Sequence, residues 1–305
     1  MVPRLKPRLG IAAKAAFRAF TGSDEPRVHS RKRAPPLIFP SMPLNIRTYH
    51  ELTERDRSDL PAQITAQRRR VADRLATVRR VVAVLSGKGG VGKSFVTAGL
   101  ARGLARSGRA TGVLDADFNG PTIPALLSLP VARCTLHEDG IEPAVGAEGV
   151  RCFSMALLLE DGRPLAFRGP ETEGHVWRET LEAATLREFL ADVAWGTLDE
   201  LLVDLPPGVQ RFQELAELLP APPAVLAVTI PTPESRDAVR RALRAASDLK
   251  ATLLGVVENM VGGPFAGSAA DEIAAEFKIP VLARVPFHPG DNVWENVVSK
   301  LGSSP

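Results

Sequence analysis

The sequence predicts an α/β fold in which a doubly wound, mainly parallel sheet carries helices on both faces. Short runs of apolar and β-branched residues alternate with amphipathic helical stretches along residues 81–305. The runs are continuously apolar, which is typical of strands that are buried on both faces of a parallel sheet. Glycine-rich and acidic loops follow several of the runs, at the end of the sheet where such folds bind their ligands.

Length and composition limit the class of protein. A chain of 305 residues with 45% hydrophobic residues can bury a sizeable core. No uncharged apolar stretch approaches the roughly 18 residues of a membrane-spanning helix. The two cysteines, Cys134 and Cys152, cannot form a disulfide framework, and the five histidines show no metal-ligand spacing. So few cysteines favour a reducing compartment, and we expect a cytoplasmic protein.

The net charge of +3 conceals a difference between the two parts of the chain. Residues 1–80 hold 18 Lys and Arg against 7 Asp and Glu, whereas residues 81–305 hold 20 against 28. The chain therefore consists of a basic leader and a mildly acidic body. Within the leader, residues 1–57 are rich in Pro, Arg and Ser, and predict a disordered tail and linker.

Residues 1–20 permit three interpretations. They carry five basic residues and no acidic residue. An amphipathic helix of this composition suits an anionic membrane surface or nucleic acid. A transit peptide has a similar composition, in which case the protein would act in an organelle matrix. The third interpretation is a plain basic tail.

The secondary-structure elements are predicted in order from residue 58. Apolar residues recur at helical spacing over residues 58–80 and predict an amphipathic helix that packs on the body. The predicted strands are residues 81–85, 111–115, 150–154, 200–204, 224–230, 252–257 and 281–285. The predicted helices lie near residues 93–107, 176–193, 211–219, 235–248 and 268–277.

The stretch SGKGGVGKSF at residues 86–95 lies between the first predicted strand and a predicted helix. It satisfies the phosphate-loop pattern in the context that this pattern requires. Its backbone N–H groups can form an anion-binding nest, and the N-terminus of the helix adds positive potential. We expect Lys93 to reach the β- and γ-phosphates of a nucleotide and the Ser94 hydroxyl to bind Mg²⁺. The predicted nucleotide-binding residues of this loop are Gly87, Gly89, Gly90, Val91, Gly92, Lys93, Ser94 and Phe95.

Acidic residues follow two further strands, in the sequences LDADFNGPTIP and LLVDLPPG. Asp115 and Asp117 occupy positions i and i+2, so on a strand both carboxylates would point the same way. Carboxylates close to a triphosphate require a metal ion between them. Asp204 ends an apolar run, as the acidic second element of a phosphate-loop enzyme does. We therefore expect a metal site made by Ser94, Asp115 and Asp204 in a single domain that spans residues 81–305.

Several motifs carry a more specific resemblance. The early Lys88 in KGGVGKS resembles the deviant phosphate loop of the ParA/MinD superfamily. The motifs DADFNGPTIP, FRGP, DLPPG and ENM, with the stretch FAGSAADEIAAEFKIPVLARVPF, resemble the Mrp/ApbC type of iron–sulfur cluster carrier ATPase within that superfamily. The resemblance covers about residues 80–290 and implies a MinD-like phosphate-loop NTPase fold.

The resemblance implies roles for individual residues. In the superfamily two subunits enclose two nucleotides, so Lys88 would reach across a homodimer to the partner's phosphates, as an arginine finger does. Asp117 would position the attacking water, which makes Lys88, Lys93 and Asp117 the predicted catalytic residues. Asp204 would hold a water of Mg²⁺, and Asn259 would hydrogen-bond the adenine of ATP.

The sequence departs from this family in two places. Carriers of this type usually have a Cys-x-x-Cys pair soon after the ENM motif, whereas residues 261–269 contain no cysteine. Because thiolates are the usual cluster ligands, the usual bridging iron–sulfur cluster is not expected, and Cys152 reads as a core residue. The polar segment that usually follows the acidic strand is replaced by GVQR at residues 208–211.

Two functions remain compatible with the sequence. The first is a dimeric Mg-ATP hydrolysing enzyme linked to iron–sulfur cluster assembly or transfer, which acts with a client or scaffold protein. The second is a positioning or regulatory ATPase of the ParA/MinD kind, whose ATP-dependent dimer binds membrane, DNA or a protein partner. A reductase like the nitrogenase iron protein needs a cysteine after the acidic strand, and residues 204–212 have none.

Overall fold

The computed structural model describes residues 60–302 except residues 119, 130–133, 138–139, 147, 159–173, 266 and 291. The predicted leader at residues 1–57 and the FRGP motif at residues 167–170 therefore lie outside the described residues. The described residues from Gln67 onward belong to one unit. Within the described part of the chain, no helix is both long and apolar enough to span a membrane.

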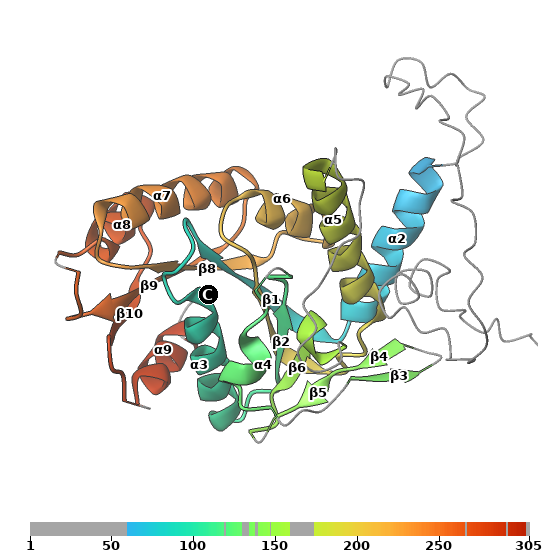
Figure 1. The fold of residues 1–305 in the computed structure, drawn as a ribbon, viewed down its shortest axis with the longest axis horizontal. Coiled ribbons are helices and arrows are strands. Elements are labelled where there is room, and N and C mark those ends of the chain that lie inside the picture. Colours follow the sequence, from blue (N-terminus) through green and yellow to red (C-terminus); the bar gives the residue numbers. More distant parts are fainter. Residues whose placement is uncertain are drawn as a thin grey trace, which may run out of the picture. The chain divides into compact units, whose positions relative to one another are not determined.

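An eight-stranded sheet forms the centre of this unit, in the order β10-β9-β8-β1-β7-β2-β6-β5 (Figure 1). All neighbouring strands are parallel except β5 and β6, which are antiparallel. The strands are β1 Val78–Ser86, β2 Thr111–Asp115, β5 Ala144–Val145, β6 Arg151–Ser154, β7 Leu198–Asp204, β8 Ala224–Thr229, β9 Leu253–Val261 and β10 Val281–Pro286. A separate antiparallel pair consists of β3 Thr135–His137 and β4 Gly140–Glu142.

Helices cover both faces of the sheet (Figure 1). One face carries α5 Gly174–Asp192, α6 Gln210–Leu218, α7 Pro233–Asp248 and α8 Ala270–Phe277. The other face carries α3 Lys93–Arg106, α4 Ile123–Leu126 and α9 Val293–Gly302. Strands β2 and β8 are buried along their whole length, as expected for strands that are covered on both faces. The predicted doubly wound α/β fold is confirmed.

The structure corrects the boundary between the first helix and the first strand. The helix predicted over residues 58–80 is α2, Leu60–Leu75, and β1 already begins at Val78. Val78 pairs with Leu198 of β7, and the Arg80 guanidinium makes two hydrogen bonds of 2.9 and 2.6 Å to the Glu200 carboxylate. Cross-strand pairing therefore overrides the helical spacing of the apolar residues at this point.

Some elements were not predicted from the sequence. They are the 3₁₀ helix Met155–Leu157, the short helix α4, the strands β3, β4 and β5, and the C-terminal helix α9. The signal for α9 is present, because Trp294, Val297 and Leu301 recur at helical spacing and are buried. The β-strands concerned have only two or three residues each, which is too short to show a period.

Two glycines allow α9 to pack closely on α3. A Cβ atom at Gly99 would lie 2.1 Å from the Trp294 ring, and a Cβ atom at Gly103 would lie 2.9 Å from the Cβ atom of Trp294. The indole therefore rests directly on the helix backbone. The Phe95 ring meets it edge-on, with 5.8 Å between ring centroids.

Candidate functional site

The loop between β1 and α3 is held by close backbone packing. A Cβ atom at Gly87 would lie 2.3 Å from backbone and side-chain atoms of Ala238 in α7. Gly92 has a φ of 77°, and a Cβ atom there would lie 2.2 Å from the Asn259 amide nitrogen. Glycine is therefore required at both positions. Gly87 lacks space for a side chain, and Gly92 lacks that space and also has a left-handed backbone conformation. The loop ends at the N-terminus of α3, where free backbone N–H groups favour anions.

Asp204, the last residue of β7, contacts three side chains of α3. The Lys93 ammonium lies 2.7 Å from Asp204 Oδ1, and the Thr97 hydroxyl donates to the same oxygen at 2.7 Å. The Ser94 hydroxyl donates to Asp204 Oδ2 at 2.6 Å. The Asp204 side chain is fully buried, so these partners supply the interactions that water would otherwise provide.

Thr97 is a site residue that the sequence analysis missed. It lies one helical turn after Lys93, and its hydroxyl is within 3.0 Å of the Lys93 carbonyl oxygen. A hydroxyl residue at position i+4 from the loop lysine is therefore the signal that could have identified it. The predicted partners Lys93, Ser94 and Asp204 are brought together, as their order in the chain suggested.

Asp115 lies beside Asp204, because β2 and β7 are paired in register at these two residues. Burial, followed by the nearby Asp204 charge, raises the pKa of the Asp115 carboxyl to about 7. Its Oδ2 atom accepts hydrogen bonds from the Ser154 hydroxyl at 3.1 Å and from the Ile123 backbone N–H at 3.3 Å. Asp115 thus accepts hydrogen bonds from β6 and α4, whereas the Ser94 hydroxyl donates its hydrogen bond to Asp204.

Asp117 does not share the environment of Asp115. Strand β2 ends at Asp115, so the strand geometry that would align positions i and i+2 does not extend to Asp117. Asp117 is half-buried, and its backbone N–H donates to Asp115 Oδ1 at 3.3 Å. The premise that Asp115 and Asp117 lie on one strand is therefore wrong. Asp117 keeps its own access to solvent at the same edge of the sheet.

The ENM motif at residues 258–260 holds two parts of the site in place. The Asn259 amide donates to the Val91 carbonyl oxygen at 2.9 Å and is almost completely buried. The buried Glu258 carboxylate accepts the backbone N–H groups of Ala269 at 2.5 Å and Ala270 at 3.1 Å, at the N-terminus of α8. Asn259 therefore contacts the loop itself, and Glu258 caps a helix.

The second lysine of the loop faces solvent. Lys88 is exposed, and its carbonyl oxygen accepts a hydrogen bond of 3.2 Å from the Ser86 hydroxyl. Phe95, which follows Ser94, is 37% exposed and points away from the buried ion pair toward Trp294. Of the predicted loop residues, Lys93 turns inward and Lys88 turns outward, which is the division expected if they serve different phosphates.

The segment after Asp204 is connected to the loop and to α5. The Gly208 backbone N–H donates to the Ser86 carbonyl oxygen at 3.2 Å. Arg211 is buried and pairs with Glu182 of α5 and with Glu214 of α6, at 2.5 Å for the second pair. Arg211, the last residue of the GVQR segment, therefore makes an ionic link between α6 and α5.

The two cysteines lie in the core of the protein. Both are free and buried, Cys152 on β6 and Cys134 in the loop before β3. Burial raises the pKa of the Cys134 thiol to about 11, and burial followed by the Asp115 charge holds the pKa of the Cys152 thiol well above its ordinary value. Across the described ranges, no group of three or more His, Cys, Asp or Glu side chains could hold a metal ion. Both thiols are therefore buried and favour the protonated form.

Comparison with known proteins agrees with this geometry. Residues 77–297 match a family model of the ParA group described as NUBPL iron-transfer P-loop NTPase. An iron–sulfur cluster carrier protein of Saccharolobus solfataricus is 34% identical over 247 residues, which cover 77% of this chain and 80% of that protein. The cytosolic Fe-S cluster assembly factor CFD1 of Chaetomium globosum is 36% identical over 240 residues, covering 70% of this chain and 76% of that protein.

Solved structures show the same relationship. A nucleotide-binding protein from Archaeoglobus fulgidus, in complex with ADP, superimposes with a TM-score of 0.61 at 31% identity and covers 78% of this chain and 94% of its own. The cell division ATPase MinD of Pyrococcus furiosus shares the fold, with a TM-score of 0.52 at 20% identity, over 74% of this chain and 99% of its own. The chain belongs to the family of Mrp/NUBP-type iron–sulfur cluster carrier P-loop NTPases, within the ParA/MinD superfamily.

Proposed function

We propose that this protein is a Mg-ATP hydrolysing homodimer that serves iron–sulfur cluster assembly or transfer in the cytoplasm. The observation that carries the proposal is the set of α3 side chains around Asp204, at the end of a glycine loop in a chain of this family. The Archaeoglobus fulgidus relative, which is in complex with ADP, supports nucleotide binding at this loop. The cytosolic assembly factor among the relatives supports the compartment.

The binding step follows from the chemistry of the buried ion pair. Lys93 pairs with the carboxylate of Asp204 at 2.7 Å. The β- and γ-phosphates of ATP offer this ammonium more negative charge, so Lys93 would exchange Asp204 for the nucleotide. Ser94 and Asp204 would then be free to hold Mg²⁺ and its water, with the neighbouring Asp115 beside Asp204. Bound Mg²⁺ neutralises charge on the phosphate oxygens during transfer.

The hydrolysis step uses the residues that face solvent. Asp117 would orient the attacking water, since it lies at the same edge of the sheet and is half-buried. Lys88 would neutralise the developing charge on the phosphates of the partner subunit. Asn259, which holds the loop through Val91, has its amide oxygen left to accept a hydrogen bond from adenine.

The iron–sulfur cluster would be cargo whose ligands this chain does not supply. Residues 261–269 contain no cysteine, and Cys134 and Cys152 are buried in the core. We infer that a client or scaffold protein provides the thiolates while this chain provides the ATP-dependent step. The leader remains a candidate contact for an anionic membrane or nucleic acid; the MinD structure shares the fold alone and does not favour a positioning role.

Anaerobic reconstitution tests the assignment of the cargo. Iron and acid-labile sulfide are measured per dimer for the wild-type chain and for the Cys134→Ser and Cys152→Ser variants, with ATP binding measured on the same samples. We expect substoichiometric iron in all three proteins and intact ATP binding. A stoichiometric cluster that either substitution removes would show that this chain carries the cluster itself.

A further inference from the structure

We propose that a groove along α3 is a docking site for an exposed segment of a partner protein, in which an apolar anchor side chain lies next to a carboxylate. The groove lies between α9 and α4, on the face of the sheet opposite α7 (Figure 1). It is separate from the ions and hydrogen bonds around Asp204. The proposal goes beyond the ATPase reaction and does not depend on whether the chain carries a cluster.

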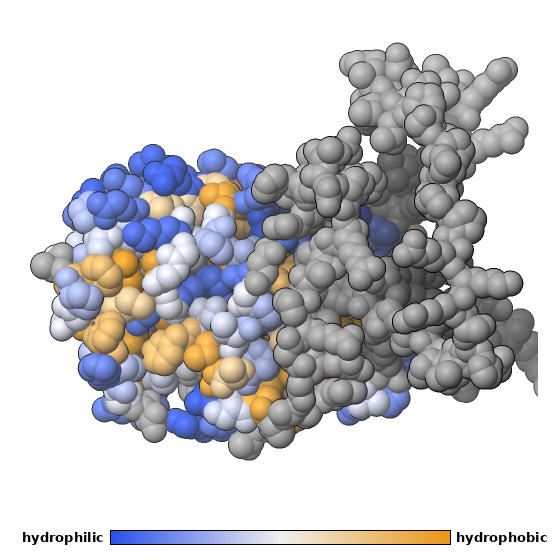
Figure 2. Space-filling view, viewed as in Figure 1, coloured by the Kyte–Doolittle hydropathy of each residue, from blue (hydrophilic) through white to orange (hydrophobic). Residues whose placement is uncertain are grey.

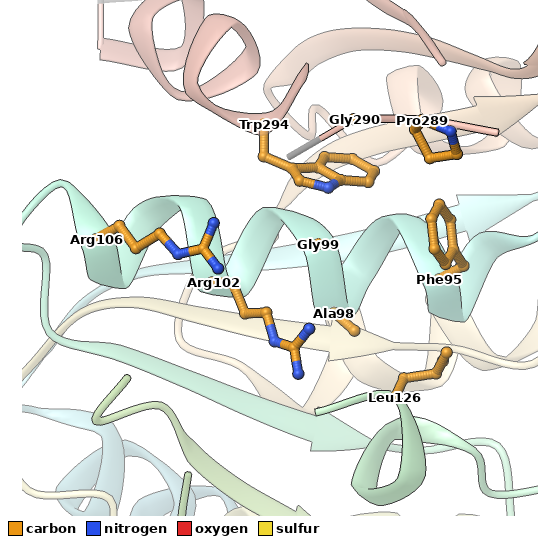
Figure 3. Close-up of a pocket in the computed structure, with 9 residues that line it drawn as sticks. All are labelled: Phe95, Ala98, Gly99, Arg102, Arg106, Leu126, Pro289, Gly290 and Trp294. Carbon is orange, nitrogen blue, oxygen red and sulfur yellow. The ribbon is translucent and has the colours of Figure 1, made fainter. Parts of the chain in front are cut away.

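The groove has an apolar end and a basic end. Figure 3 shows Phe95, Trp294, Pro289 and Leu126 around one end, and the guanidinium groups of Arg102 and Arg106 toward the other. The remaining lining residues, Ala98, Gly99 and Gly290, have little or no side chain, which keeps the floor of the groove low.

The size of the groove favours a protein side chain over a free ligand. Its volume is about 230 Å³. Pockets for drug-sized ligands usually have about 300–1,000 Å³, whereas the anchor pocket of a protein interface needs room for one large side chain. Membrane binding uses apolar side chains that protrude into the lipid, whereas this site is a recess, so it is poorly suited to a membrane surface.

The apolar end is exposed although most large apolar side chains are buried. Phe95 is 37% exposed, and Phe287, two residues before Pro289, is 48% exposed. Figure 2 shows hydrophobic surface over the region of β10, α9 and α3, bordered by hydrophilic residues. Packing of Trp294 on Gly99 fixes one wall, so an incoming side chain would meet a preformed surface.

Among the described residues, the two arginines at the basic end share one carboxylate. Arg102 Nε and Arg106 Nη2 each lie 3.6 Å from the same oxygen of Glu148, and Arg102 Nη2 donates to the Ser128 hydroxyl at 3.3 Å. Arg102 Nε is buried and has no hydrogen-bond partner within the part of the chain that the structure describes. One shared carboxylate therefore leaves donors of two guanidinium groups for a second carboxylate.

Charge complementarity selects the occupant. A carboxylate beside an apolar side chain satisfies both ends of the groove, so the segment is acidic and belongs to another protein. The basic leader of this chain, with 12 Lys and Arg against 5 Asp and Glu in residues 1–57, would place like charges against Arg102 and Arg106.

Selection of short random peptides displayed on phage, with the full chain and Mg-ADP as the target, tests the proposal. Enriched peptides are synthesised with a fluorescent label, and their Kd is measured by anisotropy on wild type, Arg102→Glu/Arg106→Glu and Leu126→Asp. We expect a Trp, Phe or Leu anchor next to Asp or Glu, and a Kd at least about tenfold weaker in both variants. Arg241→Glu, a single charge reversal at an exposed position of α7, should leave the Kd within about twofold.

Three results would overturn the proposal: no enrichment, enriched peptides without this pattern, or peptides that bind the groove variants as tightly as wild type. The milder Arg102→Gln/Arg106→Gln variant replaces the charge-reversed one if the latter does not fold. ADP affinity, measured on the same samples, separates loss of the groove from loss of the proposed ATPase site. In a parallel experiment, binding of the protein to vesicles that contain phosphatidylglycerol is measured. If wild type binds the vesicles, the arginine variants do not, and no peptide is enriched, the arginines bind lipid and the proposal is overturned.

Discussion

At the scale of single residues, both oxygens of the Asp204 carboxylate are engaged by side chains of α3. A buried carboxylate without such partners would carry a desolvation cost of several kcal/mol. The ion pair with Lys93 therefore keeps the site compact before nucleotide binds. On the proposed function, an anion that attracts Lys93 more strongly would release Asp204 for Mg²⁺ and its water, which would couple phosphate binding to metal binding.

The two loop lysines should differ when each is replaced. We expect Lys93→Ala to abolish nucleotide binding, because it removes the ammonium that would meet the β- and γ-phosphates. Lys88→Ala, the matched change in the same loop, should leave binding largely intact and slow hydrolysis by about 10³-fold or more. Fluorescent-nucleotide titration and phosphate release measure the two effects. Micromolar ATP affinity in Lys93→Ala would refute the assignment of the loop.

The raised pKa of Asp115 predicts a pH dependence of stability. An acid whose pKa rises from 3.8 to about 7 on folding is held protonated by the fold. Its contribution to stability is fully present below pH 3.8 and is lost as the pH rises through about 7. Asp115→Asn cannot ionise, so its stability relative to wild type should increase between pH 5 and pH 8, by up to about 3 kcal/mol.

Urea unfolding at pH 5 and pH 8, in the presence of a metal chelator, measures this difference. Ser154→Ala serves as the control, because it removes one hydrogen bond to Asp115 without removing the titrating group. A constant difference between Asp115→Asn and wild type across this pH range would show that Asp115 does not titrate there.

At the scale of elements, helix α3 serves two surfaces with one sequence. Its first turn meets Asp204, while Gly99 and Gly103 face the indole of α9. Glycine inside a helix costs about 1 kcal/mol relative to alanine. The cost is offset here because the missing Cβ atoms allow Trp294 to fill the space between the two helices.

Gly99→Ala should therefore destabilise the protein despite the better helix propensity of alanine. The new Cβ atom would lie 2.1 Å from the Trp294 ring, and relief of that overlap should cost about 1–3 kcal/mol in the free energy of unfolding. Trp294→Ala removes the clash, so the double variant should be less destabilised than the sum of the single ones. Urea denaturation of the four proteins completes the cycle, and simple additivity would show that the two residues do not interact.

At the scale of the whole molecule, the sheet order places the functional groups at the carboxyl ends of neighbouring strands. Strand β1 lies between β7 and β8. Strands β2 and β6 lie beyond β7, and strands β9 and β10 lie beyond β8. The carboxyl ends of adjacent strands therefore bring together the loop that follows β1, the last residue of β7, Asp204, and the last residue of β2, Asp115. Lys88 remains exposed there, available to a second copy of the chain.

Mixing two inactive variants tests whether Lys88 acts across a dimer. In a mixed dimer of Lys88→Ala and Asp117→Ala, the site on the first subunit keeps its own Asp117 and receives Lys88 from the second. Random pairing should restore about a quarter of wild-type hydrolysis. If Lys88 acts within its own subunit, each site lacks one group and the mixture stays inactive. Sedimentation with ATP verifies that mixed dimers form.

The sequence by itself determined the fold class, the glycine loop with Lys93 and Ser94, and the acidic strand end at Asp204. Each of these depends on local pattern: apolar runs of a certain length, glycines at fixed spacing, and a carboxylate after a strand. The family resemblance rested on the same local motifs and was confirmed. The leader at residues 1–57 and the catalytic roles of Lys88 and Asp117 remain predictions.

Only the tertiary structure decided which of these groups meet and what surrounds them. The register of β2 against β7 places Asp115 beside Asp204 and raises its pKa, and no spacing along the chain encodes that register. The contact of Asn259 with Val91 spans 168 residues of sequence. Ser154 and the groove along α3 become visible for the same reason: they arise from the packing of segments far apart in the chain, where burial and neighbouring charges set the chemistry.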